Sequence, residues 1–220
     1  DLMPFITVAE NVGKYLSNFF PEEKKARIAE LLEIVEMTAF ADVKAKLLSG
    51  GQMQRVALAR VLALEPEVLL LDEPFSHIDN FRKNSLRRKL FGYLKEQQIT
   101  CIVATHDSTD VLAFADEVAI IKEGKIVESG IPKFIYGNPK DKYVASLFGD
   151  VNEIKINGEL KFVYPHQLKA VMNSDLKVEI VNSYFRGSHY LMEAKFENQT
   201  LFFESDELLE NGEVVCLKIK

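Results

Sequence analysis

The sequence predicts an α/β domain followed by a smaller, mostly β domain. Two apolar segments of strand length, at 67–74 and 100–107, are separated by a long helical segment, which is the order of a strand–helix–strand unit with a right-handed crossover. From 150 on, short strand-like segments alternate with Asn-Gly and Gly-Ser turns. We therefore expect a domain boundary near Gly149, after which about 70 residues remain, the size of a small five-stranded barrel.

The first part of the chain begins with predicted helices. Residues 22–37 place apolar side chains at helical spacing after Pro21, which predicts an amphipathic helix with one buried stripe. A second helix is expected over 52–64, closed by Pro66. The run "EVLLLDEP" at 67–74 is continuously apolar, which is typical of a strand covered on both faces in a parallel sheet.

Further elements follow in the order of an α/β layer. Asp79 is expected to cap a helix that extends to about Gln98, and "TCIVATHD" at 100–107 predicts a second apolar strand. A short helix is expected over 108–114. The segment "EVAIIKEGKIVESG" predicts a hairpin that turns at Glu123 and Gly124.

Composition excludes several classes of protein. The 220 residues are 47% apolar and 27% charged, which is typical of a soluble globular chain, and the net charge of -6 argues against a nucleic-acid binder. The local basic run over 82–89 is expected to be a solvated helix face. Two distant cysteines suit the cytoplasm. No apolar run reaches the roughly 20 residues that span a bilayer, so any membrane role is expected to come through a partner.

The segment "LSGGQ" at 48–52, which leads into the predicted helix over 52–64, contains two glycines and therefore little side-chain bulk. One interpretation is a turn, because serine is a common N-cap and glycine tolerates unusual backbone angles. The other is an anion site, because helix N-termini present unpaired N–H groups that glycines leave open to a phosphate. These five residues alone favour neither.

Polar side chains follow both predicted strands. Asp72 and Glu73 end the first strand, and this residue pair suits a magnesium ligand and a group that positions an attacking water. His106 ends the second strand and could hydrogen-bond a terminal phosphate. Ser76 and Asp79 lie in the next loop. Each has an ordinary structural alternative, but their joint order is a pattern that chance rarely supplies.

This joint pattern resembles the ATP-binding cassette (ABC) ATPases. "LSGGQ" is similar to their signature motif, "VLLLDEP" to their Walker B strand, "SHID" to their D-loop and "ATHD" to their switch histidine. The resemblance extends over nearly all of 1–148, a helical subdomain to about 64 and a core over 65–148. The tail at 149–220 resembles the transport-associated, OB-like β-barrel domain of bacterial solute importers, although Tyr164–Gln167 stands where importers often have Arg-Pro-Glu-Asp.

The resemblance implies an ATPase that uses ATP and Mg²⁺. It makes Glu73 and His106 catalytic and Asp72 the magnesium residue, and it implies nucleotide contacts for Asp79 and the signature residues, which are Ser49, Gly50, Gly51 and Gln52. In the family the signature motif faces the γ-phosphate held by the opposite subunit of a homodimer. The implied partners are therefore a second ATPase subunit and a membrane permease, at the cytoplasmic face of the cell membrane, with no nucleic acid.

The resemblance is incomplete in one motif. A phosphate-binding P-loop reads Gly, four residues, then Gly-Lys-Ser/Thr, and neither Gly-Lys pair of the chain, at 13–14 or 124–125, fits it. Family order places this Walker A segment before Asp1, and the glutamine of the family's Q-loop with it. The chain therefore resembles the C-terminal portion of a longer P-loop ATPase and is expected to be inactive alone.

Two alternatives stay open at the level of sequence. One is an ABC ATPase that moves no solute, such as a DNA-repair or translation factor. The net negative charge and the β-rich C-terminal segment disfavour this alternative. The other is a non-catalytic, truncated or regulatory module. Importers of polyamines, ferric ions, sugars and sulfate share the layout, so the resemblance implies no particular cargo. "RGSH" at 186–189 reads equally as a turn or a site.

Overall fold

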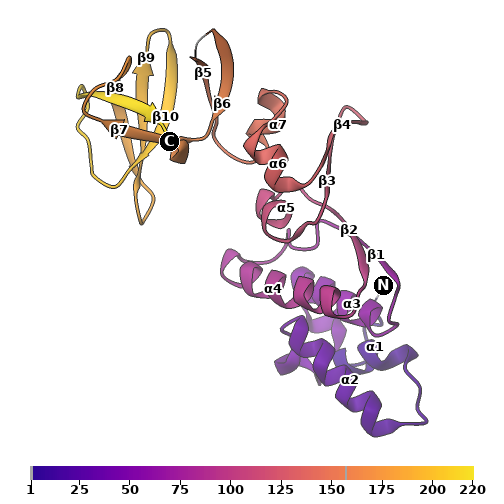
Figure 1. The fold of residues 1–220 in the computed structure, drawn as a ribbon. Helices are drawn as coiled ribbons and strands as arrows, with labels where there is room; N and C mark the ends of the chain where they lie inside the picture. Colours follow the sequence, from indigo (N-terminus) through magenta and orange to yellow (C-terminus); the bar gives the residue numbers. More distant parts are fainter. Residues whose placement is uncertain (1, 157) are drawn as a thin grey trace. The chain divides into compact units, whose positions relative to one another are not determined.

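The computed structural model describes residues 2–156 and 158–220, which divide into two compact units, 1–110 and 111–220 (Figure 1). The elements of the first unit are α1 (Val8–Val12), η1 (Gly13–Tyr15), α2 (Pro21–Ile34), η2 (Thr38–Phe40), η3 (Ala45–Leu47), α3 (Gly50–Leu62), β1 (Val68–Asp72), α4 (Asn80–Glu96) and β2 (Thr100–Ala104). Helix α5 (Ser108–Phe114) crosses the division. None of the described helices is long and apolar enough to cross a membrane.

Several helices begin where local signals place them, although the helix predicted over 52–64 is observed at Gly50–Leu62. Ser49 caps α3 and Asp79 caps α4 through the backbone N–H of Arg82, at 3.0 Å, which confirms the predicted start of the long helix. Pro21 stands at the first position of α2, where its missing N–H costs nothing. The predicted helix over 108–114 has the same bounds as α5.

Strands β1 and β2 pair in parallel with Val68 opposite Thr100 and Asp72 opposite Ala104. The prediction that these strands are covered on both faces is wrong. Leu69 is buried in the core of this unit, whereas Leu70 is 71% exposed and Ile102 61% exposed. The described sheet has only these two strands, and core packing covers one of its faces, so the apolar run alternates between buried and exposed positions.

One hydrophobic core joins the helices of the first unit to this strand pair. It includes Val8 of α1, Leu31 of α2, Val56 of α3 and Leu90 of α4, all at 0% exposure. Leu69 of β1 belongs to the same cluster. The strand ends that carry the predicted site residues are thus fixed to a packed helical layer.

The second unit contains a hairpin, two short helices and a β-rich part. Its elements are β3 (Val118–Lys122), β4 (Lys125–Gly130), α6 (Pro132–Gly137), α7 (Lys142–Ser146), β5 (Asn152–Ile156), β6 (Glu159–Val163), η4 (Pro165–Gln167), β7 (Leu168–Val171), β8 (Leu176–Phe185), β9 (Tyr190–Phe196), β10 (Gln199–Ser205) and β11 (Val214–Ile219). The hairpin turns at Glu123 and Gly124 as predicted, both at positive φ, as a mirror-image hairpin turn requires.

Strands β7 to β11 form one antiparallel sheet in the order β10-β9-β8-β11-β7, and β5 and β6 form a separate hairpin (Figure 1). The segment 186–189 is a turn between β8 and β9, because the Arg186 backbone N–H donates to the His189 carbonyl at 2.8 Å and Gly187 has a φ of 91°. Part of the predicted Asn-Gly turn at 157–158 lies outside the described residues.

An aromatic stack joins α6 to the β-rich part of this unit. The rings of Tyr136 and Tyr164 are parallel, with centroids 4.3 Å apart, and the His166 ring stacks beside them. The Tyr164 hydroxyl donates to the Ala145 carbonyl of α7 at 3.2 Å, and burial raises the pKa of this hydroxyl. The β-rich part is therefore anchored to both short helices within its unit.

Candidate functional site

The carboxyl ends of β1 and β2 lie at the same edge of the parallel pair. Asp72 and Ala104 are register partners, and the Glu73 backbone N–H donates to the Ala104 carbonyl at 2.9 Å, which extends the pairing by one residue. Glu73 and the segment 105–107 therefore begin side by side. Ligands of open α/β sheets bind at such edges, where loops leave the strands.

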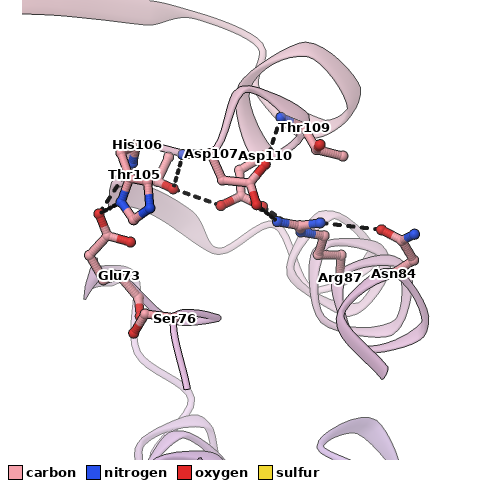
Figure 2. Close-up of polar contacts among 9 residues, drawn as sticks. All are labelled: Glu73, Ser76, Asn84, Arg87, Thr105, His106, Asp107, Thr109 and Asp110. Atoms are coloured by element: carbon pink, nitrogen blue, oxygen red, sulfur yellow. Dashed lines mark hydrogen bonds and ion pairs between the residues drawn. The ribbon is translucent and has the colours of Figure 1, made fainter. Parts of the chain in front are cut away.

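Glu73 and His106 contact each other directly (Figure 2). The Glu73 Oε1 atom lies 2.5 Å from His106 Nδ1 and accepts a second hydrogen bond, at 3.2 Å, from the His106 backbone N–H. The Glu73 side chain is 36% exposed and the His106 side chain 81% exposed. The structure thus brings together the two residues predicted to be catalytic, at a surface that a substrate can reach.

The backbone of Glu73 adopts a left-handed conformation, with a φ of 46°. Non-glycine residues rarely do so, and the conformation costs on the order of 1–3 kcal/mol that surrounding contacts must offset. Its carbonyl accepts hydrogen bonds from the Ser76 backbone N–H (3.2 Å), the Ser76 hydroxyl (3.0 Å) and Gln54 Nε2 (3.2 Å). The turn that aims the Glu73 side chain is therefore held from α3 and from its own loop.

The glycine-containing N-terminus of α3, at 49–52, forms a capping box in this structure. Ser49 Oγ accepts from the Gln52 backbone N–H at 3.3 Å, and Gln52 Oε1 accepts from the Ser49 N–H at 2.9 Å. This is the turn interpretation of the motif. The Ser49 hydroxyl keeps its own proton for a further acceptor, so the cap leaves the anion interpretation a prediction.

The two glycines of this start differ in their surroundings. A Cβ on Gly51 would lie 2.4 Å from the His77 carbonyl oxygen, so a close backbone approach requires glycine there. A Cβ on Gly50 would meet nothing within 4 Å. Gly51 therefore joins α3 to the loop that carries Ser76 and Asp79, whereas Gly50 leaves open space.

Asp72 is the predicted magnesium residue, and it lies exposed at the end of β1. No group of three His, Cys, Asp or Glu side chains within 2–156 and 158–220 could hold a metal ion. Mg²⁺ commonly takes only one or two protein carboxylates and completes its shell with water and substrate phosphates. One exposed carboxylate fits that pattern.

A cluster of polar side chains lies beside His106, with Arg87 and Asp110 as its buried members, and the sequence did not predict it (Figure 2). We call it the Arg87 cluster; it consists of Asn84, Arg87, Thr105, Asp107 and Asp110. The prediction of a solvated basic face is wrong for Arg87, whose side chain is 4% exposed. Its position three residues before Leu90 and seven before Leu94, both buried, was the available signal.

Charges in the Arg87 cluster are paired. Arg87 Nε lies 2.5 Å from Asp110 Oδ1, and Arg87 Nη2 lies 2.5 Å from Asp107 Oδ2. Partial burial acts to raise the pKa of the Asp107 carboxyl, but hydrogen bonds from Arg87 and Thr109 outweigh it, so this pKa is lowered. Asp107 is therefore ionised at neutral pH in the folded protein.

Comparisons with known proteins identify relatives of this chain. The profile of the family described as ABC transporter matches residues 1–76. The chain is 32% identical, over 243 aligned positions, to the Fe(3+) ions import ATP-binding protein FbpC of Mannheimia succiniciproducens, an alignment that covers 96% of this chain and 69% of the relative. It is 42% identical to the spermidine/putrescine import ATP-binding protein PotA of Mesorhizobium japonicum, over 69% of this chain and 42% of that one.

Solved structures share the fold over about three fifths of this chain. The ATP-binding cassette MJ0796, a dimer bound to ADP and Pi in its post-hydrolysis state, matches with a TM-score of 0.53 and 33% identity over 60% of this chain and 59% of that one. The protein cbiO1 from Clostridium perfringens, part of the ABC transporter complex cbiONQ, matches with a TM-score of 0.54 and 33% identity over 63% and 55%. The chain spans between about two fifths and two thirds of the curated relatives named above. With an FbpC relative covered over 69% of its length, this chain belongs to the ATP-binding proteins of ABC transporters.

Proposed function

We propose that the protein is the ATP-hydrolysing subunit of a bacterial ABC importer, which works with a membrane permease at the cytoplasmic face of the membrane. The observation that carries the proposal is the contact between Glu73 and His106 at the carboxyl edge of the parallel strands. The relatives named as import ATP-binding proteins support the importer class.

Glu73 positions and deprotonates the water that attacks the γ-phosphate of ATP, and His106 contacts that phosphate. An ionised carboxylate accepts protons, and the left-handed turn at 73 directs this one toward the exposed edge of the sheet. Asp72 would hold Mg²⁺, which supplies charge neutralisation to the phosphates when bound. The two carboxylates thus have separate tasks on consecutive residues.

The signature residues act on the nucleotide of a second subunit. MJ0796 forms a dimer, and the open space at Gly50, with the free hydroxyl proton of Ser49, suits an incoming phosphate. Gln52 braces the cap, and the contact between Gly51 and His77 links the signature helix to the loop of Asp79. Through this link, ATP bound by the signature residues of one subunit affects the position of the Asp79 loop in that subunit. Asp79 in turn contacts the nucleotide of the other site.

The permease docks on the helices before residue 40. Exposed aromatic side chains gather on this part of the chain, with Phe5 at 73%, Phe19 at 90% and Phe20 at 62% exposure. A groove of about 400 Å³ runs between α1 and α2, lined by Ile6, Ala9, Glu10, Gly13, Lys14, Lys24 and Ile28. Exposed aromatic side chains and an open groove are each typical of a protein interface.

We assign 1–148 to the ATPase domain, with its helical subdomain to about 64, and 149–220 to an OB-like, transport-associated domain. The antiparallel sheet of β7 to β11 and the β5–β6 hairpin support the second assignment, because small five-stranded barrels are built from such pieces.

Nucleotide binding and hydrolysis test the proposal. The product of the complete gene should bind and cleave MgATP, and E73Q should lower turnover about 10²- to 10⁴-fold while ATP still binds. E67Q, at the opposite end of β1, is the matched control and should keep normal turnover. Absence of ATP binding in the complete protein would refute the proposal, and near-normal turnover of E73Q would remove Glu73 from its role.

Dimer closure is measured separately by sedimentation of the E73Q protein with and without ATP. Adding S49R should abolish ATP-dependent dimers and leave ATP binding by the monomer intact, because a long cation replaces the hydroxyl beside the open space. A dimer that survives S49R would contradict the signature assignment.

A further inference from the structure

The Arg87 cluster holds both residues that flank His106 in the chain (Figure 2). We propose that Arg87 is a positioning residue for His106, acting through Asp107. The role of His106 toward ATP rests on the proposed function. The contacts by which Arg87 positions His106 do not depend on that function.

Thr105 and Asp107 are each fixed by side-chain hydrogen bonds. Thr105 Oγ1 donates to Asp110 Oδ2 at 2.8 Å and accepts from the Asp107 backbone N–H at 3.0 Å. The Asp107 carboxylate accepts from Arg87 through Oδ2 at 2.5 Å and from the Thr109 N–H through Oδ1 at 3.0 Å. His106 therefore lies between two anchored neighbours.

Arg87 is itself held on several sides. Its Nε atom pairs with Asp110, its Nη1 atom donates to Asn84 Oδ1 at 3.2 Å, and its guanidinium carbon lies 5.4 Å from the centroid of the Phe75 ring. Lysine carries the same charge but has no planar fork that can reach two carboxylates at fixed angles. The arrangement therefore requires arginine at 87.

The orientation of His106 depends on this anchoring because two of its groups converge on one atom. Its backbone N–H and its Nδ1 both contact Glu73 Oε1. A rotation of the segment 105–107 would break both contacts together. The His106 side chain is 81% exposed, so packing against other side chains contributes little to its orientation.

The positioned ring has a defined tautomer. An ionised carboxylate only accepts hydrogen bonds, so a neutral His106 facing Glu73 carries its proton on Nδ1 and leaves Nε2 unprotonated. In this tautomer Nε2 only accepts a hydrogen bond. Because phosphate oxygens accept as well, a contact between His106 and the γ-phosphate goes through a bridging water or needs a second proton on the ring. Nitrogen-15 NMR distinguishes the two tautomers, and this readout does not depend on ATP.

The test compares D107A, D107N and R87K in the 220-residue chain. D107A removes the link to His106 and keeps the buried Arg87–Asp110 pair, so the fold should persist. We expect the Nδ1–H tautomer of His106 to be lost in D107A and R87K and retained in part in D107N, whose amide oxygen still accepts from Arg87. R88Q, an exposed neighbour on α4, should leave the tautomer unchanged.

A folded D107A chain that keeps the Nδ1–H tautomer would overturn the inference. If D107A does not fold, R87K decides in the same way, since its lysine keeps a positive charge beside Asp110. In the complete gene product, D107A should lower kcat about tenfold to a hundredfold, because a misplacement of about 1 Å has effects of that size, with the KM for ATP nearly unchanged.

The two proposals fail in different ways. A tautomer change in D107A together with no ATP turnover by the wild-type complete protein would refute the proposed function and support the positioning role. Normal turnover in the wild-type complete protein, with the tautomer and kcat unchanged in D107A, would support the proposed function and refute the positioning role of Arg87.

Discussion

Two pairs of polar side chains, Glu73 with His106 and Arg87 with Asp110, meet near the same loop and differ in their exposure to solvent. The Glu73 and His106 side chains are 36% and 81% exposed, whereas those of Arg87 and Asp110 are both 4% exposed. An exposed pair contributes about 0–1 kcal/mol to stability and can exchange its partners for a ligand. A buried pair cannot lose one member without leaving an uncompensated charge. The inner pair is thus suited to holding the loop and the outer pair to chemistry.

The largest effect is expected from breaking the inner pair. D110A should lower the free energy of unfolding by about 3–5 kcal/mol, because it leaves the Arg87 guanidinium buried beside one remaining, partly exposed carboxylate. Urea denaturation followed by circular dichroism measures the loss. D42A, at an exposed aspartate of the same unit, should change it by less than about 0.5 kcal/mol. A loss for D110A as small as that of D42A would show that the cluster does not stabilise the fold.

A second effect contrasts the two glycines of the signature helix. G51A should destabilise by about 1–3 kcal/mol, because its Cβ would lie 2.4 Å from the His77 carbonyl oxygen. G50A should be neutral or stabilising by up to about 1 kcal/mol, because its Cβ has room and alanine favours the helix. Thermal unfolding of both variants checks the order. Equal midpoints would contradict the close approach of the two backbones.

Acid should weaken the inner cluster through Asp107. Its folded pKa is lowered, so its contribution is fully present above the unfolded pKa of about 3.9 and is lost as the pH falls through the folded pKa. D107N lacks this titration. The stability difference between wild type and D107N, from urea midpoints at stepwise lower pH, should therefore be constant near neutrality and shrink below about pH 4. A difference that stays constant in acid would exclude the Arg87 contact as its source.

The smallest effect on stability is expected at the outer pair. H106A should change the free energy of unfolding by no more than about 1 kcal/mol, because both partners remain solvated. Urea denaturation beside D110A makes the contrast direct. If H106A lowered the free energy of unfolding by several kcal/mol, the ring would be a structural part of the carboxyl edge of the strand pair, and the contrast with the inner pair would fail.

The sequence predicted those features that are encoded locally. The cap at Asp79, the short helix over 108–114 and the turn at Glu123 and Gly124 each depend on a few adjacent residues, and the structure confirms them. The meeting of Glu73 with the end of the second strand followed from parallel pairing. These predictions required no knowledge of distant contacts.

The features it did not predict depend on neighbours far along the chain. A continuous apolar run gives no information on which face of β1 is covered, so the exposure of Leu70 could not be read from it. The role of Gly51 depends on the approach of His77, 26 positions later. Arg87 was assigned by the charges beside it rather than by its register with Leu90, and only the latter indicates burial.

The stacked Tyr136 and Tyr164 rings also make the second unit optically distinct. The chain has seven tyrosines and no tryptophan, so tyrosine alone dominates its emission and much of its near-ultraviolet circular dichroism. Parallel rings 4.3 Å apart couple electronically, and their signal disappears when the stack separates. Unfolding of the second unit can therefore be followed in the intact chain without any introduced label, while far-ultraviolet ellipticity reports mainly helices, most of whose residues lie in the first unit.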